Sequence, residues 1–281
     1  MIPKIPIGEW VDWLVEWATQ NLGPLFDIIV VIIEFLVENF TAALLAIPPL
    51  ILILLFLPFA WYIANWRVAA GTAAGLFLIY NLNIWEPSMQ TLSMVISATI
   101  LALIIGIPMG IWTARSNTVH RITMPVLDFM QTMPPFVYLI PAVFFFGIGT
   151  VPGLIATVVF AMPPAIRLTG LGIRQVPVEL VEAAEAFGST QMQKLFKVQL
   201  PVAMPTIMAG VNQCIMLSLS MVVIAAMIGV SGLGKEVLRG IQRLDVPTGF
   251  EGGLAIVIIA MILDRITQNL GQKKKHPLKD K

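Results

Sequence analysis

The sequence predicts an all-α integral membrane protein with about seven transmembrane helices. Of its 281 residues, 58% are hydrophobic and 12% are charged, whereas an ordinary soluble domain carries about 25% charged residues. A helix needs roughly 20 apolar residues to cross a hydrocarbon core about 30 Å thick. Several runs of this kind follow one another along the chain. We therefore expect one polytopic membrane domain rather than several soluble ones.

Seven apolar runs are candidates for these membrane helices, and the basic residues orient them. The runs cover about residues 48–66, 68–85, 89–114, 122–147, 151–167, 203–229 and 252–270. With a cytoplasmic carboxyl end, only four of the 17 basic residues lie outside, namely Lys4, Lys235, Arg239 and Arg243. Cytoplasmic loops are enriched in Lys and Arg, so we expect the amino terminus outside and the basic tail 272–281 at the inner headgroups.

Residues 1–47 form a segment of different character, because their polar and apolar residues alternate with helical spacing. Gly23-Pro24 is expected to separate two helices here. Tryptophans at helical spacing lie beside an acidic stripe in the first helix: Trp10, Trp13 and Trp17. Amphipathic helices with tryptophan on their apolar side lie in the membrane interface. We therefore expect residues 1–47 to form an extracytoplasmic scaffold.

The second half of this segment allows an alternative. Residues 28–47 are apolar enough to be a membrane span themselves. That arrangement would bury Glu34 and Glu38 in the membrane, at a cost of a few kcal/mol for each charge without a partner.

A charged loop between two of the expected spans is predicted to fold as two short helices. Pro177 suits a first helical turn, and Gly188 suits a left-handed helix cap. Thr190 and Gln193 have the spacing of a capping box that opens a second helix. Pro201 is expected to mark the turn into the next span. The result would be a compact helix–glycine–helix unit that projects from the membrane.

The same loop carries a motif. Glu182-Ala183-Ala184, Gly188 and Val198-Gln199-Leu200-Pro201 follow the spacing EAA-x3-G-x9-I-x-LP, with valine in place of isoleucine. This resembles the cytoplasmic loop of the membrane subunits of binding-protein-dependent ABC importers. In that family the loop docks on the ATPase. The resemblance therefore implies a coupling role for Glu182, Ala183, Ala184, Gly188, Val198, Leu200 and Pro201.

Flanking segments narrow the resemblance to the glycine betaine/proline betaine permeases of type I ABC importers. The matching segments are residues 128–153, 160–177 and 212–234. The resemblance implies a five-helix permease core over 87–271, with a coupling loop at 168–202 and two accessory membrane helices in 48–86. It also implies a bacterial cell membrane location and partners on both sides of it: a second copy of the chain, two ATP-binding subunits and an external binding protein. ATP and magnesium would bind the ATPase, with no cofactor on this chain and no nucleic acid partner.

The implied function is ATP-driven uptake of glycine betaine or a related osmoprotectant by a subunit that is not itself an enzyme. Choline, carnitine, proline or an amino acid are alternative cargoes for the same class. An ion-coupled secondary carrier is a further alternative. Such a carrier should show ionisable residues near the middle of the membrane, and the apolar runs contain almost none.

Prolines and aromatic residues suggest a transport pathway. Prolines inside membrane helices are tolerated where the freed backbone groups are buried in protein or line a cavity. Aromatic faces hold quaternary ammonium groups. The candidate pathway or gate residues are Met133, Pro134, Tyr138, Phe144, Met162 and Pro163.

A glycine-rich segment and a charged residue near the end of one span carry two further predictions. Residues 229–235 spell G-x-x-x-x-G-K, but Glu236 follows where a P-loop has Ser or Thr, and a membrane helix rather than a strand precedes them. We expect an external helix there, over 235–244. Asp128 is expected to pair with Arg121 or with Arg167.

Overall fold

The structure is a computed structural model that describes residues 7–272. Lys4 and the lysines of the basic tail lie outside the described residues. The described chain is helical: α1 Ile7–Ala46, α2 Pro49–Ile63, α3 Trp66–Asn81, α4 Trp85–Arg115, α5 Asn117–Thr132, α6 Pro135–Phe146, α7 Thr150–Arg174, α8 Val178–Ala186, α9 Gln191–Lys194, the π-helical turn η1 Leu195–Gln199, α10 Leu200–Ala226, α11 Leu233–Arg243 and α12 Val246–Gln272. This confirms the predicted all-α membrane fold.

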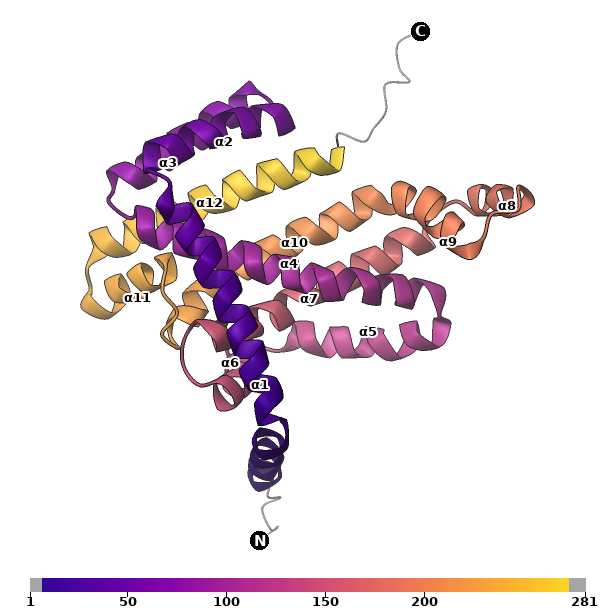
Figure 1. The fold of residues 1–281 in the computed structure, drawn as a ribbon, viewed down its shortest axis with the longest axis horizontal. Coiled ribbons are helices and arrows are strands. Elements are labelled where there is room, and N and C mark those ends of the chain that lie inside the picture. The colour runs from indigo at the N-terminus through magenta and orange to yellow at the C-terminus, as the bar shows by residue number, and fades with distance from the viewer. Residues whose placement is uncertain (1–6, 273–281) are drawn as a thin grey trace.

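Long helices that run alongside one another form the centre of the molecule (Figure 1). Among the described residues, five helices are long and apolar enough to cross a membrane, and six if the bent pair α5–α6 counts as one span. Small residues let α4 and α7 pack closely. A Cβ added at Gly106 would lie 2.9 Å from the Cβ of Ala165, and one added at Gly110 would lie 2.5 Å from the Cβ of Thr169.

The expected span 122–147 is broken in the structure. Its two parts, α5 and α6, meet at an angle of 99°. Met133 has an extended backbone with ψ 133° at the break, because a proline disfavours the helical conformation of the residue before it. Here Pro134 and Pro135 follow in succession, and Pro135 starts α6. The two prolines thus end one helix and begin the next.

The expected spans 48–66 and 68–85 are shorter than predicted. They form α2 and α3, of 15 and 16 residues, which correspond to about 22–24 Å of helix. Asn65, at the turn between the two helices, caps the start of α3: its side-chain oxygen accepts a hydrogen bond from the amide of Val68 at 3.0 Å. Both helices pack on α12 and make a hairpin at the side of the central helices.

Helix α1 corrects the expected break at Gly23-Pro24. It is one helix of 40 residues with Pro24 inside it; an internal proline removes one backbone hydrogen bond and can kink a helix without ending it. Figure 1 shows α1 running across the central helices rather than along them. Ile33 and Val37 pack on α4 and α7, and the hydroxyl of Ser93 donates to the carbonyl of Val37 at 3.2 Å.

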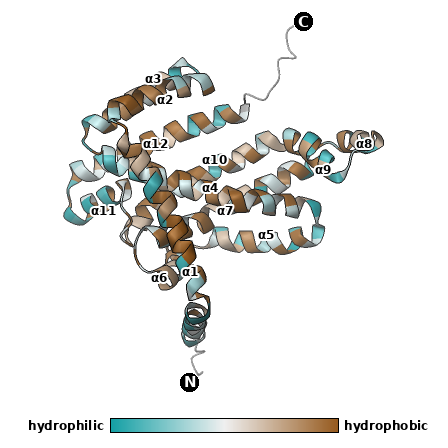
Figure 2. Ribbon diagram, viewed as in Figure 1, coloured by the Kyte–Doolittle hydropathy of each residue, from teal (hydrophilic) through white to brown (hydrophobic). Residues whose placement is uncertain are grey.

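Polar residues collect at the two ends of the central helices. Figure 2 shows hydrophilic colouring on α11 at one end and on the turn between α4 and α5 and parts of α8–α9 at the other, with hydrophobic segments between them. This pattern is that of a chain whose middle lies in lipid and whose ends are in water.

Candidate functional site

The predicted helix–glycine–helix unit is present at the end of the molecule formed by α8 and α9 (Figure 1). Helix α8 ends in a Schellman motif. The amide of Gly188 donates to the carbonyl of Glu185 at 2.9 Å, and the amide of Ser189 donates to that of Ala184 at 3.0 Å. Gly188 has φ +75°, which confirms the predicted left-handed cap.

Two interactions fix the second helix against the first. Thr190 and Gln193 form the predicted capping box, in which the hydroxyl of Thr190 accepts from the amide of Gln193 at 3.3 Å and the side chain of Gln193 accepts from the amide of Thr190 at 2.9 Å. Lys194 then pairs with Glu185 of α8. Lys194 is buried while Glu185 is about half exposed, so the ion pair closes the α8–α9 hairpin on its inner side.

The sequence did not predict this ion pair. The available signal was the combination of opposite charges with a glycine turn between them.

The expected turn at Pro201 is absent. Helix α9 continues without a break through the π-helical turn η1 into α10, so that residues 191–226 form one long helix. The amide of Leu200 donates to the carbonyl of Leu195, five residues back. A proline in regular α-helix clashes with the carbonyl four residues before it. The wider π turn directly before Pro201 accommodates the ring.

One arginine anchors the α8–α9 hairpin to α4, and a second joins the end of α7 to α4. The guanidinium of Arg115, at the end of α4, donates to the carbonyl of Gln191 at 3.1 Å. That of Arg174, at the end of α7, donates to the carbonyl of Thr113 at 2.7 Å. Both helix ends and the hairpin line a cavity of about 330 Å³. A displacement of the hairpin would therefore act directly on α4 and α7.

The motif residues fall into an outward and an inward set. Glu182, Ala183 and Gly188 are exposed. Ala184 is buried, and Leu200 packs on a core cluster that includes Leu195 of η1. Val198 and Pro201 belong to the segment that continues into α10, where Val198 is half-buried and Pro201 is exposed. Ala184 is thus the small motif residue that is buried, and Leu200 joins the segment after the hairpin to the core.

The outer side of the hairpin presents apolar residues to solvent. Phe187 is 90% exposed, and Leu180 is also exposed. Large apolar side chains exposed on a projecting element are candidates for contact with another protein. The α8–α9 hairpin is thus held by internal contacts and exposes apolar side chains.

Three of the six candidate pathway residues lie together, and the other three do not. Met133 and Tyr138 meet at the break between α5 and α6, in a cluster with Phe160 and Met221. The rings of Tyr138 and Phe160 lie edge to face at 5.6 Å, and Pro134 is the residue of the break itself.

The remaining candidates lie elsewhere. Met162 packs in the cluster that joins α1, α4 and α7. Pro163 is buried inside α7, and Phe144 is 64% exposed on α6. The structure therefore brings together only the candidates at the helix break.

Two smaller predictions are confirmed. Asp128 pairs with Arg167 at 2.5 Å.

Residues 229–235 form a turn between α10 and the start of α11, with the amide of Leu233 donating to the hydroxyl of Thr91 at 2.8 Å. Helix α10 precedes the turn, and α11, at Leu233–Arg243, is the helix expected over 235–244.

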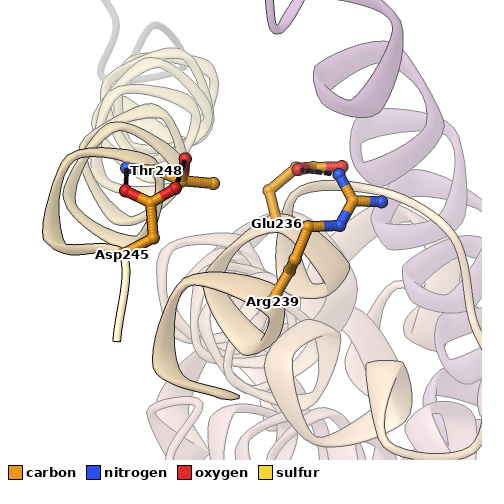
Figure 3. Close-up of polar contacts among 4 residues, drawn as sticks. All are labelled: Glu236, Arg239, Asp245 and Thr248. Atoms are coloured by element: carbon orange, nitrogen blue, oxygen red, sulfur yellow. Dashed lines mark hydrogen bonds and ion pairs between the residues drawn. The ribbon is translucent and has the colours of Figure 1, made fainter. Parts of the chain in front are cut away.

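The junction of α11 and α12 is held by local polar contacts (Figure 3). Asp245 caps α12: its carboxylate accepts from the hydroxyl of Thr248 at 2.7 Å and from its amide at 3.3 Å. These hydrogen bonds from Thr248 lower the pKa of Asp245. Glu236 and Arg239, both partly buried on α11, pair at 2.7 Å.

Comparisons with known proteins identify the family of this chain. Residues 106–276 match the family described as binding-protein-dependent transport system inner membrane component. The chain is 52% identical over 274 residues to the glycine betaine transport system permease protein OpuAB of Bacillus subtilis (strain 168), a match covering 98% of this chain and 97% of that protein. It is 48% identical over 271 residues to the glycine betaine/proline betaine transport system permease protein ProW of Escherichia coli (strain K12), covering 96% and 77%.

A solved structure supports the fold. The MetNI methionine ABC transporter in inward-facing conformations contains a chain that matches with a TM-score of 0.62 at 19% identity, over 66% of this chain and 93% of that one. The resemblance inferred from the loop and its flanking segments is thus confirmed. The chain belongs to the family of binding-protein-dependent transport system inner membrane components, as a membrane-spanning permease.

Proposed function

We propose that this permease is the translocating subunit of an ATP-driven importer of glycine betaine or a related osmoprotectant. The observation that supports the proposal most strongly is the α8–α9 hairpin. It carries the full motif spacing, projects beyond the central helices and leaves Phe187 almost entirely exposed. An ATPase subunit would bind this apolar surface and supply ATP and magnesium.

The hairpin suits the transfer of motion between subunits. Its helices are fixed to each other by the Schellman motif, the capping box and the Lys194–Glu185 pair. Arg115 ties the hairpin to the end of α4, and α9 continues without a break into α10. A push on α8 would therefore move membrane helices rather than be lost in a flexible loop.

The cargo follows from the relatives and from chemistry. Proteins about 50% identical over nearly the whole chain are named for glycine betaine transport. A quaternary ammonium is attracted to aromatic faces, and Tyr138 and Phe160 place two aromatic rings, packed edge to face, at the α5–α6 break. This break would be a weak transit site that opens when α5 and α6 move. The external binding protein would supply most of the affinity.

The proposed assembly contains two copies of this chain, two ATPase subunits and the external binding protein. The amino terminus would be outside and the α8–α9 hairpin in the cytoplasm. On the outer side, α11 presents exposed residues such as Ile241 and Leu244. This helix is the proposed contact with the binding protein.

Uptake into proteoliposomes tests the proposed cargo. The permease is reconstituted with its ATPase and its cognate binding protein, and labelled glycine betaine, carnitine, choline and proline are compared with ATP or a non-hydrolysable analogue inside. We expect ATP-dependent uptake of glycine betaine. Uptake of another solute in preference to glycine betaine would reassign the cargo, and uptake that follows an ion gradient without ATP would contradict the proposal.

A further inference from the structure

A groove of about 350 Å³ lies between α3 and α12, away from the hairpin and the helix break. Its walls are mostly apolar, with Val68 on α3 facing Ile258, Met261 and Ile262 on α12. Gly71 leaves part of the groove open, because a Cβ added there would meet no atom within 4 Å. The groove can therefore hold a chain of methylene groups along the helices.

One end of the groove carries two guanidinium groups. Arg67 of α3 and Arg265 of α12 both line it, and both are exposed. Within residues 7–272, neither forms an ion pair; the guanidinium carbon of Arg67 lies 5.8 Å from the centroid of the Trp66 ring. Asn65 lines the same end.

The neighbouring carboxylate is engaged elsewhere. Asp264 accepts hydrogen bonds from Asn212 of α10 at 2.9 Å and from Gln268 at 2.7 Å. It therefore lies on the side of α12 that faces α10, and it is not among the residues that line the groove. The two positive charges are left for an anion from outside the chain.

The charged end of the groove lies at the level of a membrane interface. From Val246, where α12 begins, to Arg265 the helix rises about 28 Å, close to the roughly 30 Å of a hydrocarbon core. Exposed Trp61, Tyr62 and Trp66 surround the α2–α3 turn beside it. Tryptophan and tyrosine gather at membrane interfaces, and arginine side chains extend toward headgroups.

We propose that this groove binds one acidic phospholipid, with its phosphate between Arg67 and Arg265 and an acyl chain along Gly71. Guanidinium groups bind phosphate oxygens with paired hydrogen bonds, and the apolar walls match a hydrocarbon tail. In the proposed orientation this lipid belongs to the inner leaflet. The site joins the α2–α3 hairpin to α12 and does not depend on the identity of the cargo.

Native mass spectrometry of the purified, lipid-stripped transporter tests the proposal. Phosphatidylglycerol, phosphatidylcholine and glycerol phosphate, which lacks acyl chains, are titrated separately. The wild type should bind phosphatidylglycerol about tenfold or more tightly than phosphatidylcholine, at about 1 kcal/mol for each basic residue. Glycerol phosphate should bind much more weakly; equal binding would show a site for free phosphate rather than lipid and would overturn the proposal.

Two kinds of variant locate the site. The double variant Arg67→Gln/Arg265→Gln should abolish the preference for phosphatidylglycerol. Its control, Arg121→Gln, changes an exposed arginine on α5 outside the groove and should retain the preference.

Gly71→Leu fills the groove without changing charge and should weaken binding of both lipids. Gly253→Leu, which also meets open space, is its control. The proposal would be refuted if the double arginine variant kept its preference for phosphatidylglycerol. It would also be refuted if a folded Gly71→Leu protein bound both lipids as tightly as the wild type.

Discussion

At the scale of single residues, Gly188 decides the geometry of the α8–α9 hairpin. It adopts φ +75°, and no atom would lie within 4 Å of an added Cβ. The demand on this position is therefore conformational and not steric. For residues other than glycine and asparagine, the left-handed conformation costs about 1–2 kcal/mol.

This reasoning predicts a difference between two substitutions at the same position. Gly188→Val should destabilise the Schellman motif by about 1–2 kcal/mol, while Gly188→Asn should stay close to the wild type. Hydrogen exchange at the Ser189 amide, which donates to Ala184, measures the opening of the motif. Faster exchange by about tenfold is expected for the valine variant alone, and equal rates in the two variants would contradict the argument.

A second residue makes a pH-dependent contribution. Hydrogen bonds from Thr248 lower the pKa of Asp245 below its ordinary value of 3.8. A lowered pKa means that the cap stabilises the start of α12 fully above pH 3.8 and loses this contribution as the pH falls through the lower, folded value. The contribution is therefore complete at neutral pH.

Hydrogen exchange at the Thr248 amide as a function of pH tests this assignment. Protection in the wild type, after correction for intrinsic exchange, should fall only below pH 3.8. Asp245→Asn keeps an acceptor oxygen at the cap but does not titrate, and its protection should be independent of pH over the same interval. Loss of wild-type protection centred above pH 3.8 would show that the sign of the shift is wrong.

At the scale of elements, the contact between α4 and α7 depends on glycines four residues apart on α4. A Cβ added at Gly110 would lie 2.5 Å from the Cβ of Thr169 and 2.8 Å from the carbonyl oxygen of Ile166. Backbone atoms cannot move aside as side-chain ends can. The helices would have to separate.

Gly110→Leu should therefore lower the stability of the permease by about 1–3 kcal/mol, despite the higher helix propensity of leucine. Gly253→Leu makes the same change where the structure is open and serves as the control. Thermal unfolding in detergent compares the two variants. Indistinguishable melting temperatures would contradict the close packing of α4 on α7.

Sequence and structure diverge most where elements join. The caps of the hairpin follow from Thr190, Gln193 and Gly188, because capping is a local property that a short segment determines. The continuation of α9 into α10 does not, since a π turn has no sequence signal of its own and Pro201 is commonly read as a helix start. The same limit applies to Pro24, whose effect depends on what packs on either side of it.

At the scale of the whole molecule, composition and the motif predicted the fold class and the family. They did not predict that α5 and α6 would meet at 99°, although Pro134-Pro135 marked the position. Contacts between distant segments, such as Lys194 with Glu185 or Arg115 with Gln191, could not be derived because they depend on the tertiary arrangement. The groove between α3 and α12 is likewise a property of packing.

The orientation proposed for the molecule is tested by labelling. Cys214 is buried and is the single cysteine of the chain, so a Cys214→Ala background removes any competing thiol. A cysteine introduced at exposed Gln191 should react with an impermeant reagent only from the cytoplasmic side. Labelling of intact cells or right-side-out vesicles from the outside would reverse the assignment.

The central claim is that an ATPase drives this permease through the apolar surface of the α8–α9 hairpin. Phe187 is 90% exposed, so its removal should leave the isolated permease as stable as before. Phe77, exposed on α3 and away from the α8–α9 hairpin, provides a matched control.

The most direct measurement is the number of glycine betaine molecules imported per ATP hydrolysed in proteoliposomes containing the complete transporter. For Phe187→Ala we predict a loss of coupled uptake of about tenfold or more, as expected when a buried aromatic contact is removed from an interface, with an unchanged melting temperature of the permease. Phe77→Ala should import at the wild-type rate. Wild-type uptake and coupling in Phe187→Ala would contradict the account.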